Sequence, residues 1–136
     1  MQPPAPDSLA PDAALFERLA RAALDALPAA YAGPAREVAL RIEDFADDET
    51  LADMGIANPY DLSGLYSGVP VPRKSVFAQP QQPDEIFLFR RPILEEWIER
   101  GNVTLAELVT HVLVHEIAHH FGWSDADIAR IDRWWE

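Results

Sequence analysis

The order of apolar and polar positions predicts a first helix and two strands. Apolar residues recur at helical spacing from about residue 11 to residue 27, and either Ser8 or Asp12 can cap this helix. Its apolar positions are Leu15, Leu19, Ala22, Ala23 and Ala26. Residues 38–42 alternate as in a half-buried strand, and the four consecutive apolar residues of Glu85–Phe89 give the strongest strand signal.

Helix signals dominate the second half of the chain. Pro92 suits the first turn of a helix expected over Ile93–Arg100. Thr104 and Glu107 form a capping box that opens a long helix to about residue 121, where Gly122 suits a C-terminal stop. A short helix is expected within residues 44–53, extended pieces at 65–66 and 75–77, and a last helix from residue 124.

These elements predict an α+β fold, because strands and helices are mixed without a regular β-α alternation. The 136 residues allow one domain, which we expect over residues 12–136. Prolines crowd the first dozen residues and favour an extended chain, so residues 1–11 are predicted to be a disordered tail.

Charge and composition exclude several classes of protein. Eleven Lys and Arg against 23 Asp and Glu give a formal charge of −12, so the basic footprint of a nucleic-acid binder is missing. The absence of cysteine excludes disulfides, a cysteine nucleophile and thiolate-bound metal. No apolar run is long enough to span a membrane and no leader pattern stands at the start. We therefore expect a cytoplasmic protein without membrane partners, and no oligomeric state is indicated.

The four histidines of the chain fall within ten residues of the long predicted helix. Among them is the pattern His115-Glu116-Ile117-Ala118-His119, or HExxH. Residues four apart are rotated by about 400° in a helix, so His115 and His119 project from one face and can share a metal ion. Glu116 stands beside the first histidine, where it can take a proton from a water that the metal activates.

A third ligand can follow the helix. Gly122 lets the chain reverse, and Asp125 comes three residues later, which completes the pattern HExxHxxGxxD. A carboxylate at this position can turn back to the same ion and leave one position for water. The other interpretation of Asp125 is an acidic residue that favours the start of the next helix.

Other side chains can support such a site or simply pack. His111 is either a support for His115 or a packed histidine, and His120 points away from His119 and is more typical of a surface residue. Tyr60 and Tyr66 are candidate donors to a developing oxyanion, or ordinary half-buried aromatics. The pair Arg90-Arg91 can clamp a substrate carboxylate, or form a solvated strand end.

Three segments of the chain resemble the small bacterial zincin-like metallopeptidases, also called minimal zincins. In order they are Gly64–Pro70 (GLYSGVP), Pro83–Pro92 (PDEIFLFRRP) and His115–Asp125 (HEIAHHFGWSD). The last segment is also similar to the motif of metzincins, but both methionines of this chain precede it, whereas a metzincin has a methionine turn after it. The resemblance implies a zincin-like fold in which a small mixed sheet packs beside the HExxH helix.

The same resemblance implies that zinc is the cofactor, bound by His115, His119 and Asp125, and that Glu116 is the general base. We therefore expect a zinc-dependent peptidase whose partner is a peptide or protein substrate. The substrate is expected to lie along Glu85–Phe89 as an added edge strand. The alternatives are a zinc- or peptide-binding module with little or no turnover and, third, a metal-free structural domain.

Overall fold

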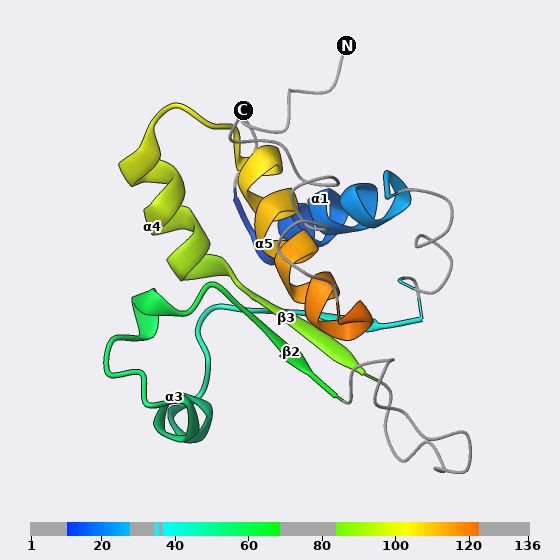
Figure 1. Cartoon of the computed structure of the whole chain (residues 1–136). Helices are drawn as coiled ribbons and strands as arrows, with labels where there is room; N and C mark the ends of the chain where they lie inside the picture. Colours follow the sequence, from blue (N-terminus) through cyan, green and yellow to red (C-terminus); the bar gives the residue numbers. More distant parts are fainter. Residues whose placement is uncertain (1–10, 28–34, 36, 69–83, 123–136) are drawn as a thin grey trace, which may run out of the picture.

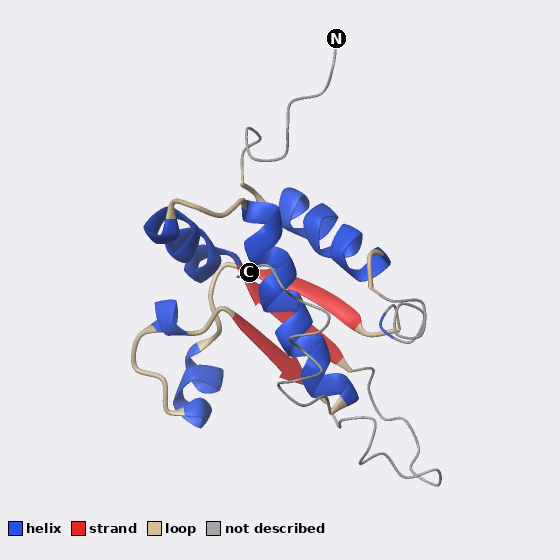
Figure 2. Ribbon diagram, turned by 45° about the horizontal axis from the view of Figure 1, so that its top comes forward, coloured by secondary structure: helices blue, strands red, loops and turns tan. Residues whose placement is uncertain are grey.

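A three-stranded sheet with helices on both faces forms the frame of the protein (Figure 1). The computed structural model describes residues 11–27, 35, 37–68 and 84–122, and of residues 120 and 121 it describes the backbone alone. Helices α1 (Ala13–Asp25) and α5 (Leu105–Phe121) cover one face of the sheet, and α3 (Asp48–Met54) lies at the other face (Figure 2). This mixed arrangement confirms the predicted α+β class.

The strand β3 (Glu85–Phe89) is the centre of the sheet. It pairs in parallel with β1 (Ala39–Glu43) and antiparallel with β2 (Gly64–Ser67), which gives the order β1-β3-β2. The expectation that Glu85–Phe89 offers an open edge to a peptide is therefore wrong. Its unbroken apolar run is typical of a strand covered on both faces, because alternate side chains need an apolar environment on each side.

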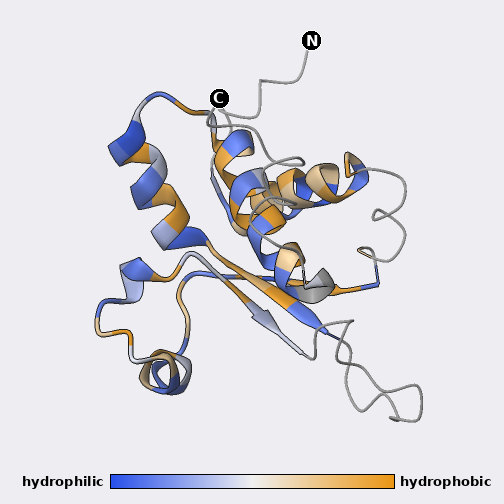
Figure 3. Cartoon of the chain, in the orientation of Figure 1, coloured by the Kyte–Doolittle hydropathy of each residue, from blue (hydrophilic) through white to orange (hydrophobic). Residues whose placement is uncertain are grey.

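Two apolar clusters lie on the two faces of the sheet. Ile86 and Leu88 of β3 point into the larger cluster, which α1 and α5 complete, whereas Phe87 and Phe89 point to the smaller cluster beside α3. Figure 3 shows the apolar sides of α1 and α5 turned toward each other and toward the sheet. Burial of this larger cluster fixes α5 on the sheet, and α5 carries the histidine motif.

Helix α1 begins and ends close to its predicted bounds. Asp12 is the N-cap, and its carboxylate accepts a hydrogen bond from the backbone N–H of Leu15 at 2.9 Å. The buried face comprises Leu15, Phe16, Ala20, Ala23 and Leu24. Ala22 and Ala26 of the expected stripe are exposed instead, because the helix turns the larger Phe16 and Leu24 toward the core.

Helix α5 is positioned by local signals at both ends. Thr104 and Glu107 form the predicted capping box: the N–H of Glu107 donates to Thr104 Oγ1 at 3.0 Å, and the N–H of Thr104 donates to Glu107 Oε1 at 3.2 Å. Gly122 ends the helix with a φ of 67°, a left-handed conformation that glycine adopts without strain. Both predicted ends are confirmed.

The remaining predicted elements are partly covered by the structure. Helix α4 (Arg90–Arg100) follows β3 directly, so it starts three residues before the predicted Ile93. The short helix expected within residues 44–53 is α3, and the extended piece at 65–66 is part of β2, which follows the 3-10 turn η2 (Pro59–Asp61). The extended piece at 75–77, the helix from residue 124 and the tail up to residue 10 lie outside the described residues.

None of the helices in the described part of the chain combines the length and apolar character that crossing a membrane requires.

Candidate metal centre

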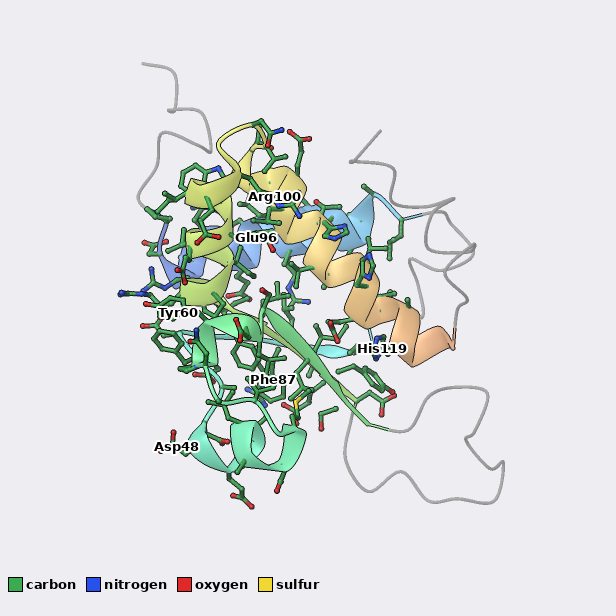
Figure 4. All side chains as sticks on the ribbon, turned by 60° about the vertical axis from the view of Figure 1, so that its left-hand side comes forward. Asp48, Tyr60, Phe87, Glu96, Arg100 and His119 are labelled. Atoms are coloured by element: carbon green, nitrogen blue, oxygen red, sulfur yellow. The ribbon has the colours of Figure 1, made fainter. Side chains whose placement is uncertain are left out.

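The last turns of α5 present the histidine motif at the protein surface. Ile117 and Ala118 are buried and hold this part of the helix against the core. His115 is half-buried and His119 is exposed. Because the helix is continuous over both, the two imidazoles project from the same side, one turn apart. Figure 4 shows His119 on the side of α5 that faces β2.

The carboxylate of Glu116 reaches the edge of β2 that is open in the described sheet, where it accepts a hydrogen bond from the backbone N–H of Tyr66. The pairing of β2 with β3 shows why this N–H is accessible. The N–H of Phe89 donates to the carbonyl of Ser63 at 2.9 Å, and in an antiparallel pair the residues that bond to the partner alternate with residues that point outward. Gly64 and Tyr66 therefore turn their backbone groups away from β3.

The environment of Glu116 strengthens it as a base. Burial raises the pKa of Glu116 above the usual value for a glutamate, because the charged form loses hydration. The charge of His119 and the hydrogen bond from the Tyr66 N–H both act in the opposite direction, and burial is the larger cause. The carboxylate thus combines a raised pKa with a fixed direction, as general-base catalysis requires.

The close approach of β2 to α5 depends on a glycine. A Cβ atom at Gly64 would lie 2.8 Å from Cγ1 of Val112 and 3.1 Å from Cγ of Glu116, both side chains of α5. These distances are too short for ordinary packing, so any larger residue would push the strand and the helix apart. Gly64 allows the contact that brings Glu116 to the strand edge.

Tyr66 lies on the helix side of the sheet, half-buried against the larger cluster. Burial raises the pKa of Tyr66 first, and the hydrogen bond with Asp84 and the charge of that carboxylate add to the rise. The neutral phenol is therefore favoured, and its hydroxyl donates to Asp84. Of the two alternatives for Tyr66, this surrounding fits the half-buried aromatic, and the backbone N–H is the group that contacts Glu116.

Tyr60 lies away from the histidine motif. It is in η2, where its ring packs edge-on against Phe45 with the ring centroids 5.1 Å apart. Figure 4 shows Tyr60 and His119 at opposite ends of β2. Tyr60 therefore does not lie where an oxyanion donor is needed, and with 38% of its surface exposed it is more open than the half-buried aromatic of the other alternative.

His111 contacts the first histidine of the motif. The centroids of the His111 and His115 rings are 4.4 Å apart, with the rings edge to face. This contact brings His111 beside His115, as both the supporting and the packing interpretation expect. The side chain of His120 lies outside the described residues.

Arg90 belongs to a structural contact on another side of the fold. Its Nε donates to Asp44 Oδ1 at 2.8 Å, and its Nη1 donates to the carbonyl of Pro11 at 3.0 Å. The guanidinium thus joins the start of α4 to the segment after β1 and to the residue before the α1 cap. This favours a structural role for Arg90 over a clamp for substrate; the neighbouring Arg91 is exposed.

The two described donors, His115 and His119, fit a zinc ion. Two imidazoles one turn apart on a rigid helix, with a carboxylate beside them, are typical of zinc sites with an open position. Within the described residues, no three metal-ligating side chains gather. The predicted third ligand, Asp125, lies outside them, so the predicted ligand set stays a prediction.

Sequence reasoning about chemistry missed two residues of this region, Gly64 and Asp84. Both stand inside the segments that carry the family resemblance, GLYSGVP and PDEIFLFRRP. A glycine at the start of a strand and an aspartate before an apolar strand are the available signals. Neither signal shows by itself that the residue will lie next to the helix of the histidine motif or to a residue that contacts it.

Comparison with protein families gives a match. A family model described as a zincin-like metallopeptidase matches residues 35–135, which is more than half of the chain and includes the three described strands and the histidine motif. Among the curated proteins, none matches this chain.

Proposed function

The chain belongs to the zincin-like metallopeptidase family, and from that membership we propose that it is a zinc-dependent peptidase that hydrolyses peptide bonds. The observation that carries the proposal is the position of Glu116, beside His115 and His119 on α5 and hydrogen-bonded to the open edge of β2. One group thus joins the predicted metal ligands to the strand edge where a peptide can bind.

We assign the metal to His115, His119 and Asp125. When bound, zinc supplies a Lewis acid that polarises the scissile carbonyl and lowers the pKa of water. Glu116 accepts the proton of the attacking water and delivers it to the leaving amine nitrogen. The raised pKa of Glu116 supports the first of these steps, because a carboxylate of this kind takes a proton more readily than an exposed one.

We place the substrate along β2. The strand is an edge of the described sheet, and the backbone groups of Gly64 point outward from it, beside Glu116. A peptide that adds to this edge pairs through its main chain, and this mode of binding places a scissile bond beside α5 whatever its side chains are. No nucleic acid or membrane takes part in this proposal, and the cytoplasm stays the predicted location.

The experiment compares wild type with Glu116→Gln and His119→Ala in a zinc-binding assay and a peptide-library cleavage assay. Gln keeps the shape of the side chain but cannot take the proton, so we expect Glu116→Gln to bind one zinc ion and to lose cleavage by at least about a hundredfold. His119→Ala loses a ligand, so we expect it to lose both zinc and cleavage.

Glu99→Gln is the matched control, because Glu99 is an exposed glutamate of α4, and its cleavage rate should equal that of wild type. Turnover by Glu116→Gln at the wild-type rate would overturn the general-base assignment. Stoichiometric zinc with no cleavage of any library peptide would favour the binding module instead.

A further inference from the structure

Asp84 is the buried charged residue of the described chain. Its relative exposure is 8%, and it lies immediately before β3. Its backbone carbonyl accepts a hydrogen bond from the N–H of Ala39 at 2.9 Å. A buried carboxylate is costly unless hydrogen bonds stabilise it. The hydroxyl of Tyr66 provides such a bond. The proposed reaction gives this carboxylate no role, and its burial beside β2 therefore needs another explanation.

The end of β2 closes over the same carboxylate. A Cβ atom at Gly68 would collide with Oδ1 of Asp84 and lie 2.7 Å from its Cγ. The φ of Gly68 is 152°, a backbone conformation that residues with a side chain rarely adopt. Glycine is therefore favoured at this position both by the lack of space and by the backbone conformation. Asp84 therefore contacts two places: β2, through the side chain of Tyr66, and the backbone just after β2, at Gly68.

Tyr66 connects this carboxylate to the proposed base. Its hydroxyl donates to Asp84, and its own backbone N–H donates to Glu116. One residue thus carries both hydrogen bonds, one from its backbone and one from the far end of its rigid aromatic ring. If the phenol is held, the peptide plane of Tyr66 has little freedom to turn, and the direction of its N–H is held with it.

We propose that Asp84 is a positioning residue, which fixes Tyr66 so that the backbone N–H of Tyr66 holds Glu116 in the direction needed for catalysis. The inference rests on the proposed function only where it makes Glu116 the general base. The physical connection from Asp84 to the Tyr66 N–H is independent of that assignment. It also stands on the burial of Asp84, its close contact with the backbone at Gly68 and the register of β2 against β3, and it is testable without any substrate.

The first measurement is amide hydrogen exchange of residue 66 in wild type, Asp84→Ala, Asp84→Asn and Tyr66→Phe. Tyr66→Phe removes only the hydroxyl and keeps the ring, so it tests the connection even where Asp84→Ala folds poorly. We expect Asp84→Ala and Tyr66→Phe to speed exchange at residue 66 by about tenfold, the loss of one net hydrogen bond. Asp84→Asn keeps an oxygen that accepts from Tyr66, so it should restore most of the protection.

Amides of Ala20 and Leu24 in α1 serve as the internal reference, because both residues are buried in the larger cluster far from Asp84 in sequence. Their exchange should not change in Tyr66→Phe. Asp53→Asn, an exposed aspartate of α3, is the matched control and should match wild type at every amide. Wild-type protection of residue 66 in Tyr66→Phe would overturn the proposal, and so would equal acceleration at the α1 amides, which indicates general loosening.

The second measurement is the kinetics of peptide cleavage. We expect kcat to fall about tenfold in Tyr66→Phe with KM and zinc affinity unchanged, and to recover in Asp84→Asn relative to Asp84→Ala. A rise in KM with kcat unchanged would contradict a role in positioning Glu116. If wild type cleaves nothing, the proposed function fails, and the exchange results still decide whether Asp84 controls the Tyr66 N–H.

Discussion

Gly64 and Val112 leave no room between them for a methyl group: a Cβ at Gly64 would stand 2.8 Å from Val112 Cγ1. This contact sets the distance between the strand β2 and the helix α5. Since Glu116 extends from the same side of α5 to the edge of β2, the spacing of strand and helix and the position of the carboxylate depend on each other.

Gly64→Ala should therefore weaken both folding and cleavage. Overpacking of this kind lowers the free energy of unfolding by about 1–3 kcal/mol, and we expect urea denaturation to show a loss in that range. The double variant Gly64→Ala, Val112→Ala removes the closest clash and should recover part of the stability. Gly101→Ala is the control, because nothing lies within 4 Å of the added Cβ and only its φ of 68° is strained. Gly101→Ala should lose stability and cleave at the wild-type rate. Cleavage by Gly64→Ala at the wild-type rate would show that the spacing of β2 and α5 does not control Glu116.

Zinc should stabilise the folded protein. An ion that binds only the native state at a hundred times its Kd adds about 2.7 kcal/mol to the free energy of unfolding. We expect zinc to raise the Tm of the metal-free wild type, a chelator to reverse the rise, and His119→Ala and Asp125→Ala to reduce it. Glu99→Gln should respond as wild type does. A wild-type Tm that is indifferent to zinc would remove the support for a metal centre.

Arg90 should matter for stability and not for substrate binding. Arg90→Lys keeps the charge but loses the paired geometry toward Asp44 and the Pro11 carbonyl, so we expect a loss of about 1 kcal/mol in the free energy of unfolding. KM and kcat should equal those of wild type. Arg91→Lys, at the exposed neighbour, is the control for both measurements. An increase in KM with Arg90→Lys would instead favour the interpretation that Arg90 binds a substrate carboxylate.

The contact of Asp44 with Arg90 should make stability depend on pH on the acid side. The hydrogen bond from Arg90, and then the charges of Arg90 and Arg91, hold the pKa of Asp44 below its usual 3.8. A carboxyl whose pKa is lowered by folding stabilises the native state above its unfolded pKa, and that contribution disappears as the pH falls through the lowered value.

Wild type should therefore be more stable than Asp44→Asn at neutral pH, and the difference should shrink as the pH falls below about 4. Urea unfolding over a pH series measures this difference. Asp53→Asn, at an exposed aspartate of α3, is the control for an Asp-to-Asn substitution as such. A difference between wild type and Asp44→Asn that stays constant down to acid pH would show that the ionised carboxylate is not the stabilising group.

The parts of the fold that the sequence predicts well depend on neighbours along the chain. The capping box at Thr104 and the glycine stop at Gly122 act within one helical turn, so both ends of α5 are readable from a few residues. The spacing of His115 and His119 follows from the helix itself. These local rules place the motif correctly and say nothing of what faces it.

The neighbours of the motif come from pairing between distant segments. The place of Glu85–Phe89 at the centre of the sheet depends on β1 and β2, which lie on either side of it in space and both before it in sequence. The contact of Tyr66 with Asp84 likewise depends on the register of β2 against β3. No local pattern specifies such a register, since it depends on which strand reaches which edge. For the same reason the local pattern of Glu85–Phe89 does not show that this strand is central and that β2 is the strand next to Glu116.

The strand order also constrains how the chain folds as it is synthesised. β1 and β2 leave the ribosome first, yet they do not pair with each other, because the strand that separates them comes last of the three. The hydrogen bonds of the sheet form only when β3 pairs with β1 on one side and β2 on the other. The entropy cost of closing the long connecting segments is therefore met before these hydrogen bonds form. A nascent chain cut before residue 85 has neither ladder, and the unpaired backbone of β1 and β2 is open to chaperones and to aggregation.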